Sequence, residues 1–183
     1  MSTLSQADTR TGISARLLLW LVPVLFTLHN FEEYLTMPPV IAELPSKIPA
    51  GIPVGILSFP PSPAEFTLSL VLVTALPFLF VALAQFGKTP RVRRTGVLLL
   101  AGTQAVLLLN VLSHLGSAVL QRGYAPGMIT SLAINLPFSL LFFSTALRQG
   151  WLVKGNLPWL ALAAVLAHTI GLIGLFWLVS GLV

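Results

Sequence analysis

Five long apolar segments constrain the fold of this chain more than any other feature. They lie at about residues 17–37, 64–86, 95–120, 127–147 and 157–181, and each is long enough to cross a bilayer as a helix of about 20 residues. Hydrophobic residues make up 56% of the chain and charged residues only 8%, whereas soluble domains carry about 25% charged residues. The sequence therefore predicts an all-α, polytopic membrane protein in which residues 17–183 form a single bundle of about five transmembrane helices.

The distribution of basic residues predicts the orientation of this bundle, because cytoplasmic loops of membrane proteins carry an excess of lysine and arginine. One arrangement of the spans collects eight of the ten basic residues on one side and leaves Lys47 and Arg122 on the other. We therefore expect a cytoplasmic N-terminus, an outer C-terminus and a multi-pass location in the bacterial inner membrane. Membrane lipids are the expected partners and oligomerisation is left open. A nucleic-acid partner is not expected, because the basic loops lack interleaved aromatic residues.

Two segments lie outside the predicted spans and are long enough to need their own interpretation. Residues 1–16 are polar and predict a disordered cytoplasmic tail. The first apolar segment is expected to be an uncleaved membrane anchor, because no small-residue cleavage site follows it. Residues 38–63 contain eight prolines among apolar residues. This composition predicts an irregular outer loop that lies on the membrane surface or forms a lid.

A group of ionisable residues interrupts the first apolar segment at His29-Asn30-Phe31-Glu32-Glu33. A charged residue near the centre of a transmembrane helix costs about 2.5–3.5 kcal/mol on insertion scales, so such residues usually face a partner, an ion or a water-filled cavity. At about 100° per residue, His29, Glu32 and Glu33 share one helical face and Asn30 faces away. The three ionisable side chains are therefore expected to face the interior of the bundle.

Polar residues on three other predicted spans also lie on single helical faces. A rise of about 1.5 Å per residue places them at a depth similar to that of the motif, in the outer half of the membrane. All three histidines of the chain fall within this band. The predicted site consists of His29, Glu32, Glu33, Asn110, His114, Asn135 and His168.

Imidazole and carboxylate groups are the usual protein ligands of zinc, iron and manganese, and a helix presents two ligands to one ion at a spacing of three or four residues. The sequence therefore predicts a divalent metal site. Its candidate ligands are His29, Glu32, Glu33, His114 and His168. One of the two glutamates would complete the metal shell and the other would act as a general base on a bound water, so Glu32 and Glu33 are also the candidate catalytic residues.

The remaining two residues of the band predict how a substrate would be held. Asn110 and Asn135 would orient ligands or polarise a substrate carbonyl, and the depth of the site predicts a lipid-like small molecule as substrate. The corresponding enzyme would be a metal-dependent intramembrane hydrolase or isomerase. The chain contains no cysteine, so disulfides, thiolate ligands and iron–sulfur clusters are excluded.

Four alternatives to a metal enzyme remain open at the level of the sequence. A desolvated, protonated glutamate with a histidine partner would give a metal-free acid–base enzyme. Intramembrane glutamate and histidine also relay protons, which would suit a proton-coupled small transporter. His114 and His168 would suit the axial positions of a haem. A purely structural polar cluster needs no ligand, because interhelical hydrogen bonds alone stabilise membrane bundles.

The segment HNFEE, in the first span of a chain of this length, resembles the HXXEE family of small, uncharacterised membrane proteins, which is named for this motif. The match is carried by His29, Glu32 and Glu33. The resemblance implies that the whole chain belongs to that family. It supplies a site and no activity.

Overall fold

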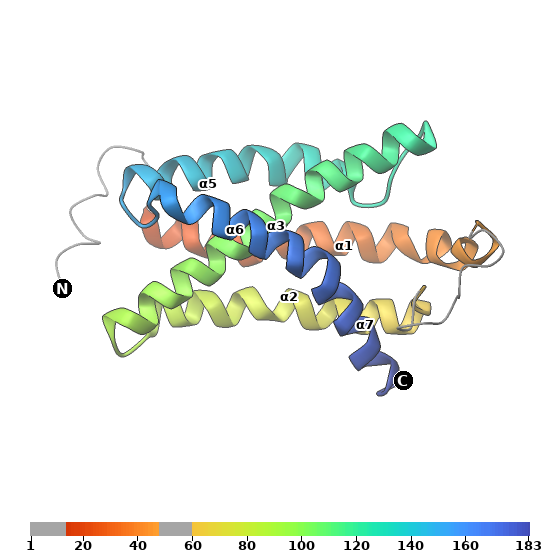
Figure 1. The fold of residues 1–183 in the computed structure, drawn as a ribbon, viewed down its shortest axis with the longest axis horizontal. Coiled ribbons are helices and arrows are strands. Elements are labelled where there is room, and N and C mark those ends of the chain that lie inside the picture. The colour runs from red at the N-terminus through yellow and green to blue at the C-terminus, as the bar shows by residue number, and fades with distance from the viewer. Residues whose placement is uncertain (1–13, 48–59) are drawn as a thin grey trace.

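The computed structural model describes residues 14–47 and 60–183, and within these ranges helices joined by short turns make up the fold, with no strand (Figure 1). The α-helices are α1 (Ala15–Lys47), α2 (Pro63–Phe86), α3 (Pro90–Gln121), α4 (Met128–Thr130), α5 (Leu136–Arg148), α6 (Leu157–Leu166) and α7 (Leu172–Ser180). Two π-helical turns, η2 (Ser131–Asn135) and η4 (Ala167–Gly171), join these α-helices into longer rods, and a 3₁₀ turn, η3 (Lys154–Asn156), precedes α6.

Four of the helical rods are long and apolar enough to cross a membrane. In the described part of the chain they are Pro63–Phe86, Pro90–Gln121, Met128–Arg148 and Lys154–Ser180. They confirm four of the five predicted spans, and the predicted 127–147 differs from the observed rod by one residue at each end. The fifth predicted span lies in α1, which carries the polar motif and packs against α2 and α3. The architecture is that of an all-helical, membrane-type bundle.

The main correction to the predicted fold concerns the loop at residues 38–63. Helix α1 continues to Lys47, so residues 38–47 are helical and the prediction of an irregular segment there is wrong. Proline fixes φ near a helical value and removes a single donor each time, so Pro38 and Pro39 are compatible with a helix whose other donors stay paired. Residues 48–59 of the loop lie outside the described residues, as do residues 1–13 of the predicted tail.

An apolar core occupies one half of the bundle. It is formed by the beginning of α1, the end of α2, the beginning of α3 and most of α5, where Val22, Val81, Leu100 and Phe142 are fully buried. Helical rods that follow one another along the chain run in opposite directions (Figure 1). The later residues of α1 therefore lie in the other half of the bundle, with the beginning of α2 and the end of α3. The polar motif therefore lies beyond the apolar core, at the end of the bundle where α3 turns into α4.

The opposite end of the bundle carries the basic connections. The beginning of α1, the turn between α2 and α3 and the turn between α5 and α6 lie together at this end (Figure 1). Lys88, Arg91, Arg93 and Arg94 belong to the α2–α3 turn and the first turn of α3. The grouping of basic loops that the sequence predicts is therefore compatible with the observed path of the chain.

Gly96 lies where α2 and α3 pack closely, and replacing it by alanine should destabilise the protein. A Cβ at Gly96 would overlap the backbone nitrogen of Ala84 and lie 2.8 Å from both Ala84 Cα and the carbonyl oxygen of Phe80. Backbone atoms cannot rotate away, so we expect a loss of about 1–3 kcal/mol, seen as a melting temperature roughly 2–12 °C lower in detergent. Gly102→Ala on the same helix is the control, since its Cβ would meet no atom within 4 Å. Equal melting temperatures for the two variants would contradict this account of the crossing.

Candidate metal centre

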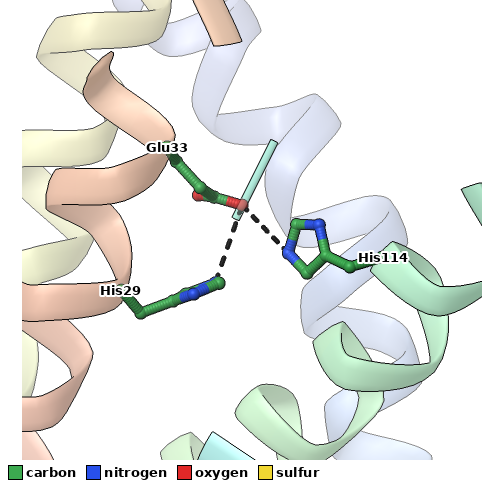
Figure 2. Close-up of side chains that lie close together, drawn as sticks. All are labelled: His29, Glu33 and His114. Atoms are coloured by element: carbon green, nitrogen blue, oxygen red, sulfur yellow. Dashed lines mark ion pairs between the residues drawn. The ribbon is translucent and has the colours of Figure 1, made fainter. Parts of the chain in front are cut away.

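Three side chains from two helices converge on one point in the polar half of the bundle. His29 and Glu33 lie one turn apart on α1 and His114 comes from α3 (Figure 2). Glu33 Oε1 lies 3.6 Å from His29 Nε2 and 3.2 Å from His114 Nε2. The three candidate ligand atoms lie within 4.8 Å of one another. His29 and Glu33, which the sequence predicts to share one face of the first span, are thus joined by His114, the histidine predicted on the third span.

The imidazole of His29 is fully buried and held from both sides. Its Nδ1 lies 2.9 Å from Thr130 Oγ1, at the end of α4. The Thr130 hydroxyl donates its only proton to Glu32 Oε2 at 2.5 Å, so it must accept a proton from His29 Nδ1. Asn110 Nδ2 donates to His29 Nε2 at 3.3 Å. Both contacts assign the tautomer with the proton on Nδ1, which leaves Nε2 unprotonated, accepting from Asn110 and 3.6 Å from Glu33 Oε1.

His114 is the least satisfied member of the cluster. The residue is 8% exposed, and its Nε2 atom is buried without a hydrogen-bond partner. The ring packs edge-on against His29, with 5.2 Å between the ring centroids. A buried polar atom without a partner usually marks a site that a water, an ion or a proton completes. Two imidazole nitrogens and a carboxylate oxygen face each other here, so these three residues could hold a metal ion.

Glu32 lies next to the cluster but is engaged elsewhere. Its Oε1 accepts from the Tyr124 hydroxyl at 2.6 Å and from the Ile129 amide at 3.1 Å. Its Oε2 accepts from the Thr130 amide at 2.7 Å and from the Thr130 hydroxyl. Burial raises the pKa of Tyr124, and its hydrogen bond to Glu32 raises that pKa further, so the phenol remains a donor at neutral pH. Glu32 therefore fastens the segment that joins α3 to α4 onto α1.

The same connecting segment closes the cluster from one side through Gly127. This residue has a φ of +78°, in the region that favours glycine. A Cβ at Gly127 would lie 2.8 Å from His114 Cε1 and 3.0 Å from Glu33 Cγ. The glycine backbone therefore packs directly on two of the three convergent side chains.

The cluster opens onto a cavity of about 430 Å³ between α1, α2, α3 and the η4–α7 segment. Most of the wall is apolar, with Phe26, Phe66 and Phe176 among the lining residues. Glu33 and His114 contribute polar atoms to this wall. Apolar pockets of this size with a few convergent polar groups are typical of small-molecule sites.

The other predicted site residues occupy three different environments. Asn110 lines the cavity and contacts His29. His168 also lines the cavity, but its Nε2 lies 3.3 Å from Ser113 Oγ and it is not one of the three convergent residues. Asn135 is fully buried in η2, where neither atom of its amide has a hydrogen-bond partner. Asn30, expected to face away, donates to Thr74 Oγ1 on α2 at 2.6 Å and borders the cavity.

Several residues around the site were not found by sequence analysis. Thr130, Tyr124 and Gly127 all lie in or beside the short connection between the third and fourth spans, which carries no charge after Arg122. The glycine and proline there signal a turn and give no indication that it returns to α1. Gln104 was also missed, although it is fully buried and donates to Ser139 Oγ at 2.6 Å.

The fold and the site together define a membrane-type helical bundle with a buried histidine–glutamate cluster beside an apolar cavity. The chain belongs to the HXXEE family, described as "Protein of unknown function with HXXEE motif", whose pattern matches residues 20–142. This confirms the resemblance carried by His29, Glu32 and Glu33. No curated protein and no solved structure gave a match.

Proposed function

We propose that this protein binds one divalent metal ion through His29 Nε2, the Glu33 carboxylate and His114 Nε2, and acts on a lipid-like substrate held in the adjacent cavity. One observation carries the proposal: the Nε2 atom of His114 is buried without a hydrogen-bond partner and lies 3.2 Å from Glu33 Oε1. Two imidazoles and one carboxylate are a common ligand set for zinc and for non-haem iron.

The proposed ligand set leaves part of the coordination sphere open toward the cavity. Catalytic metal sites typically use three protein ligands and keep a position for water or substrate. An ion at this position would activate a water or polarise a substrate carbonyl, which suits a hydrolase or an isomerase. Asn110, on the cavity wall, would donate to the substrate oxygen. Among the described residues that line the cavity, His168 is the one titratable residue outside the ligand set, so it is the candidate for proton transfer.

The proposed substrate follows from the walls of the cavity. Aromatic and aliphatic residues from four helical segments surround the space, and Glu33, Asn110, His114 and His168 bring polar groups to it. An amphiphile with one hydrocarbon chain would place its apolar part against residues such as Leu70, Phe66 and Phe176, and its polar end against the cluster. A volume of about 430 Å³ lies within the range of about 300–1,000 Å³ common for small-molecule pockets.

The proposed orientation places the basic connections in the cytoplasm, as the positive-inside rule requires. The beginning of α1 and the α2–α3 and α5–α6 turns then face the cytoplasm, and the α3–α4 connection faces outward (Figure 1). The cluster lies in the outer half of the membrane in this arrangement. Its substrate would accordingly reach it from the outer leaflet.

Metal binding by the detergent-purified protein tests the proposal directly. Protein stripped with a chelator at neutral pH would be dialysed against zinc, manganese or anaerobic ferrous ion, and the bound metal measured by elemental analysis. We expect saturable binding of one ion per chain for at least one of these metals. If none binds above the level of a detergent blank, the proposed metal site is wrong.

A further inference from the structure

The first glutamate of the motif has no acceptor capacity left for a metal. A carboxylate offers about four lone-pair positions, and Glu32 accepts four hydrogen bonds, two on each oxygen. A general base likewise needs a free lone pair for the proton it removes. Glu32 therefore holds protein groups in place, whereas Glu33 points its Oε1 between the two histidines (Figure 2).

A continuous chain of hydrogen bonds runs from Glu32 to the proposed metal position. The Thr130 hydroxyl donates its hydrogen bond to the Glu32 carboxylate, and this leaves a Thr130 lone pair as the acceptor for His29 Nδ1. With its proton fixed on Nδ1, the His29 ring presents an unprotonated Nε2 beside Glu33, whose lone pair accepts from Asn110 until a metal takes that place. Partners of this kind on the second nitrogen of a ligating histidine fix its tautomer and orientation and raise its basicity.

We propose that Glu32 is a positioning residue that sets the tautomer of His29 through the Thr130 hydroxyl, so that the two glutamates of the motif have different roles. This inference rests on the proposed function, because it assigns His29 Nε2 to the metal. It also makes a statement about the metal-free protein. There, neutral His29 should carry its proton on Nδ1, and loss of the Thr130 hydroxyl should reduce this preference to what the Asn110 contact alone supports.

The Thr130→Val variant isolates the relay. Valine has nearly the shape of threonine, and the Thr130 backbone amide remains available to Glu32, so the anchoring of α4 is preserved. The first readout is the ¹⁵N chemical-shift pattern of His29 in metal-free protein, which distinguishes the two neutral tautomers. The second is the dissociation constant for the metal, expected to rise 10- to 100-fold. Thr130→Ser, which restores the hydroxyl, should recover both values.

Two further variants connect the effect to Glu32. Glu32→Gln should alter the His29 tautomer in the wild-type background and leave it unchanged in the Thr130→Val background, because the relay is already interrupted there. Glu65→Gln is the matched control, since the Glu65 carboxylate also accepts a hydrogen bond from a backbone amide at the start of a helix, that of Ser62. It does not line the cavity, and we expect no change in tautomer or metal affinity.

The outcomes separate this inference from the proposed function. If the share of His29 that carries its proton on Nδ1 is the same in wild type and Thr130→Val, the positioning role is overturned even if the metal binds. If wild-type protein binds no metal but Thr130→Val changes the tautomer and Thr130→Ser restores it, the positioning role stands and the proposed function fails. Loss of metal affinity in Thr130→Val without rescue by Thr130→Ser would also contradict the relay.

Discussion

Metal binding is expected to fall to background in His114→Ala and in Glu33→Gln. Either change leaves two protein ligands for the ion, and Glu33→Gln also removes the only negative charge among the three convergent groups. Loss of the carboxylate leaves a buried cation without a neutralising charge, and loss of either side chain leaves its coordination sphere incomplete. Equilibrium dialysis with the metal that wild-type protein binds would measure the loss, which should exceed 1,000-fold in the dissociation constant.

His168→Ala is the control that makes this prediction decisive. His168 lines the same cavity but lies outside the group whose ligand atoms gather within 4.8 Å. The His168→Ala change should alter metal affinity by less than about threefold. Because His168 is the proposed proton-transfer residue, the same variant should lose activity. A large loss of metal in His168→Ala would support the larger ligand set of the sequence analysis, which includes His168, over the three-ligand site. Thermal unfolding of each variant in detergent would show whether a loss of metal reflects a loss of fold.

The helices of this protein could be predicted because their signal is local. A run of apolar residues about 20 long is visible without any knowledge of its neighbours, and the fourth span was placed at 127–147 against the observed Met128–Arg148. The end of α1 was not predictable in the same way. Prolines at 38 and 39 favoured a loop, whereas α1 continues through them to Lys47. Local composition thus gave the helices and misjudged where the first of them ends.

The convergence of His29, Glu33 and His114 was predictable in part from periodicity and depth. A spacing of four residues places His29 and Glu33 on one face of α1, and counting the helical rise put His114 at a similar height. Both arguments assign residues to a layer of the bundle and leave open which of them touch. They could not separate Glu32 from Glu33, because that difference depends on four donors from Tyr124 and the start of α4.

The π-helical turns explain a further limit of the helical-face argument. Ser131, Asn135 and Ser139 repeat every four residues and would share one face of a regular α-helix at about 100° per residue, but residues 131–135 form a π turn. Pro137 follows this turn and has no amide proton to donate, which disturbs the regular α-helical ladder locally. All three side chains are nevertheless buried. Their direction relative to the cluster was not available from the sequence, and Asn135 does not border the cavity.

Gly127→Ala is expected to weaken metal binding at least 100-fold while leaving the bundle folded. The added Cβ would lie 2.8 Å from His114 Cε1 and 3.0 Å from His114 Nε2 and Glu33 Cγ, so the imidazole and the carboxylate must both move away from the position of the ion. A 100-fold loss corresponds to about 2.8 kcal/mol. Displacements of a fraction of an ångström are enough, because metal–nitrogen and metal–oxygen bonds tolerate only about 0.2 Å of variation.

Gly150→Ala separates this steric effect from backbone strain. Gly150 has a φ of +73°, close to the +78° of Gly127, but a Cβ there would meet no atom within 4 Å. Both variants therefore incur a similar backbone cost of about 1–2 kcal/mol and should show similar decreases in melting temperature. Only Gly127→Ala should lose metal affinity. If both variants bind metal as wild type does, the α3–α4 connection does not shape the site, and the packing of Gly127 on His114 has no bearing on the ion.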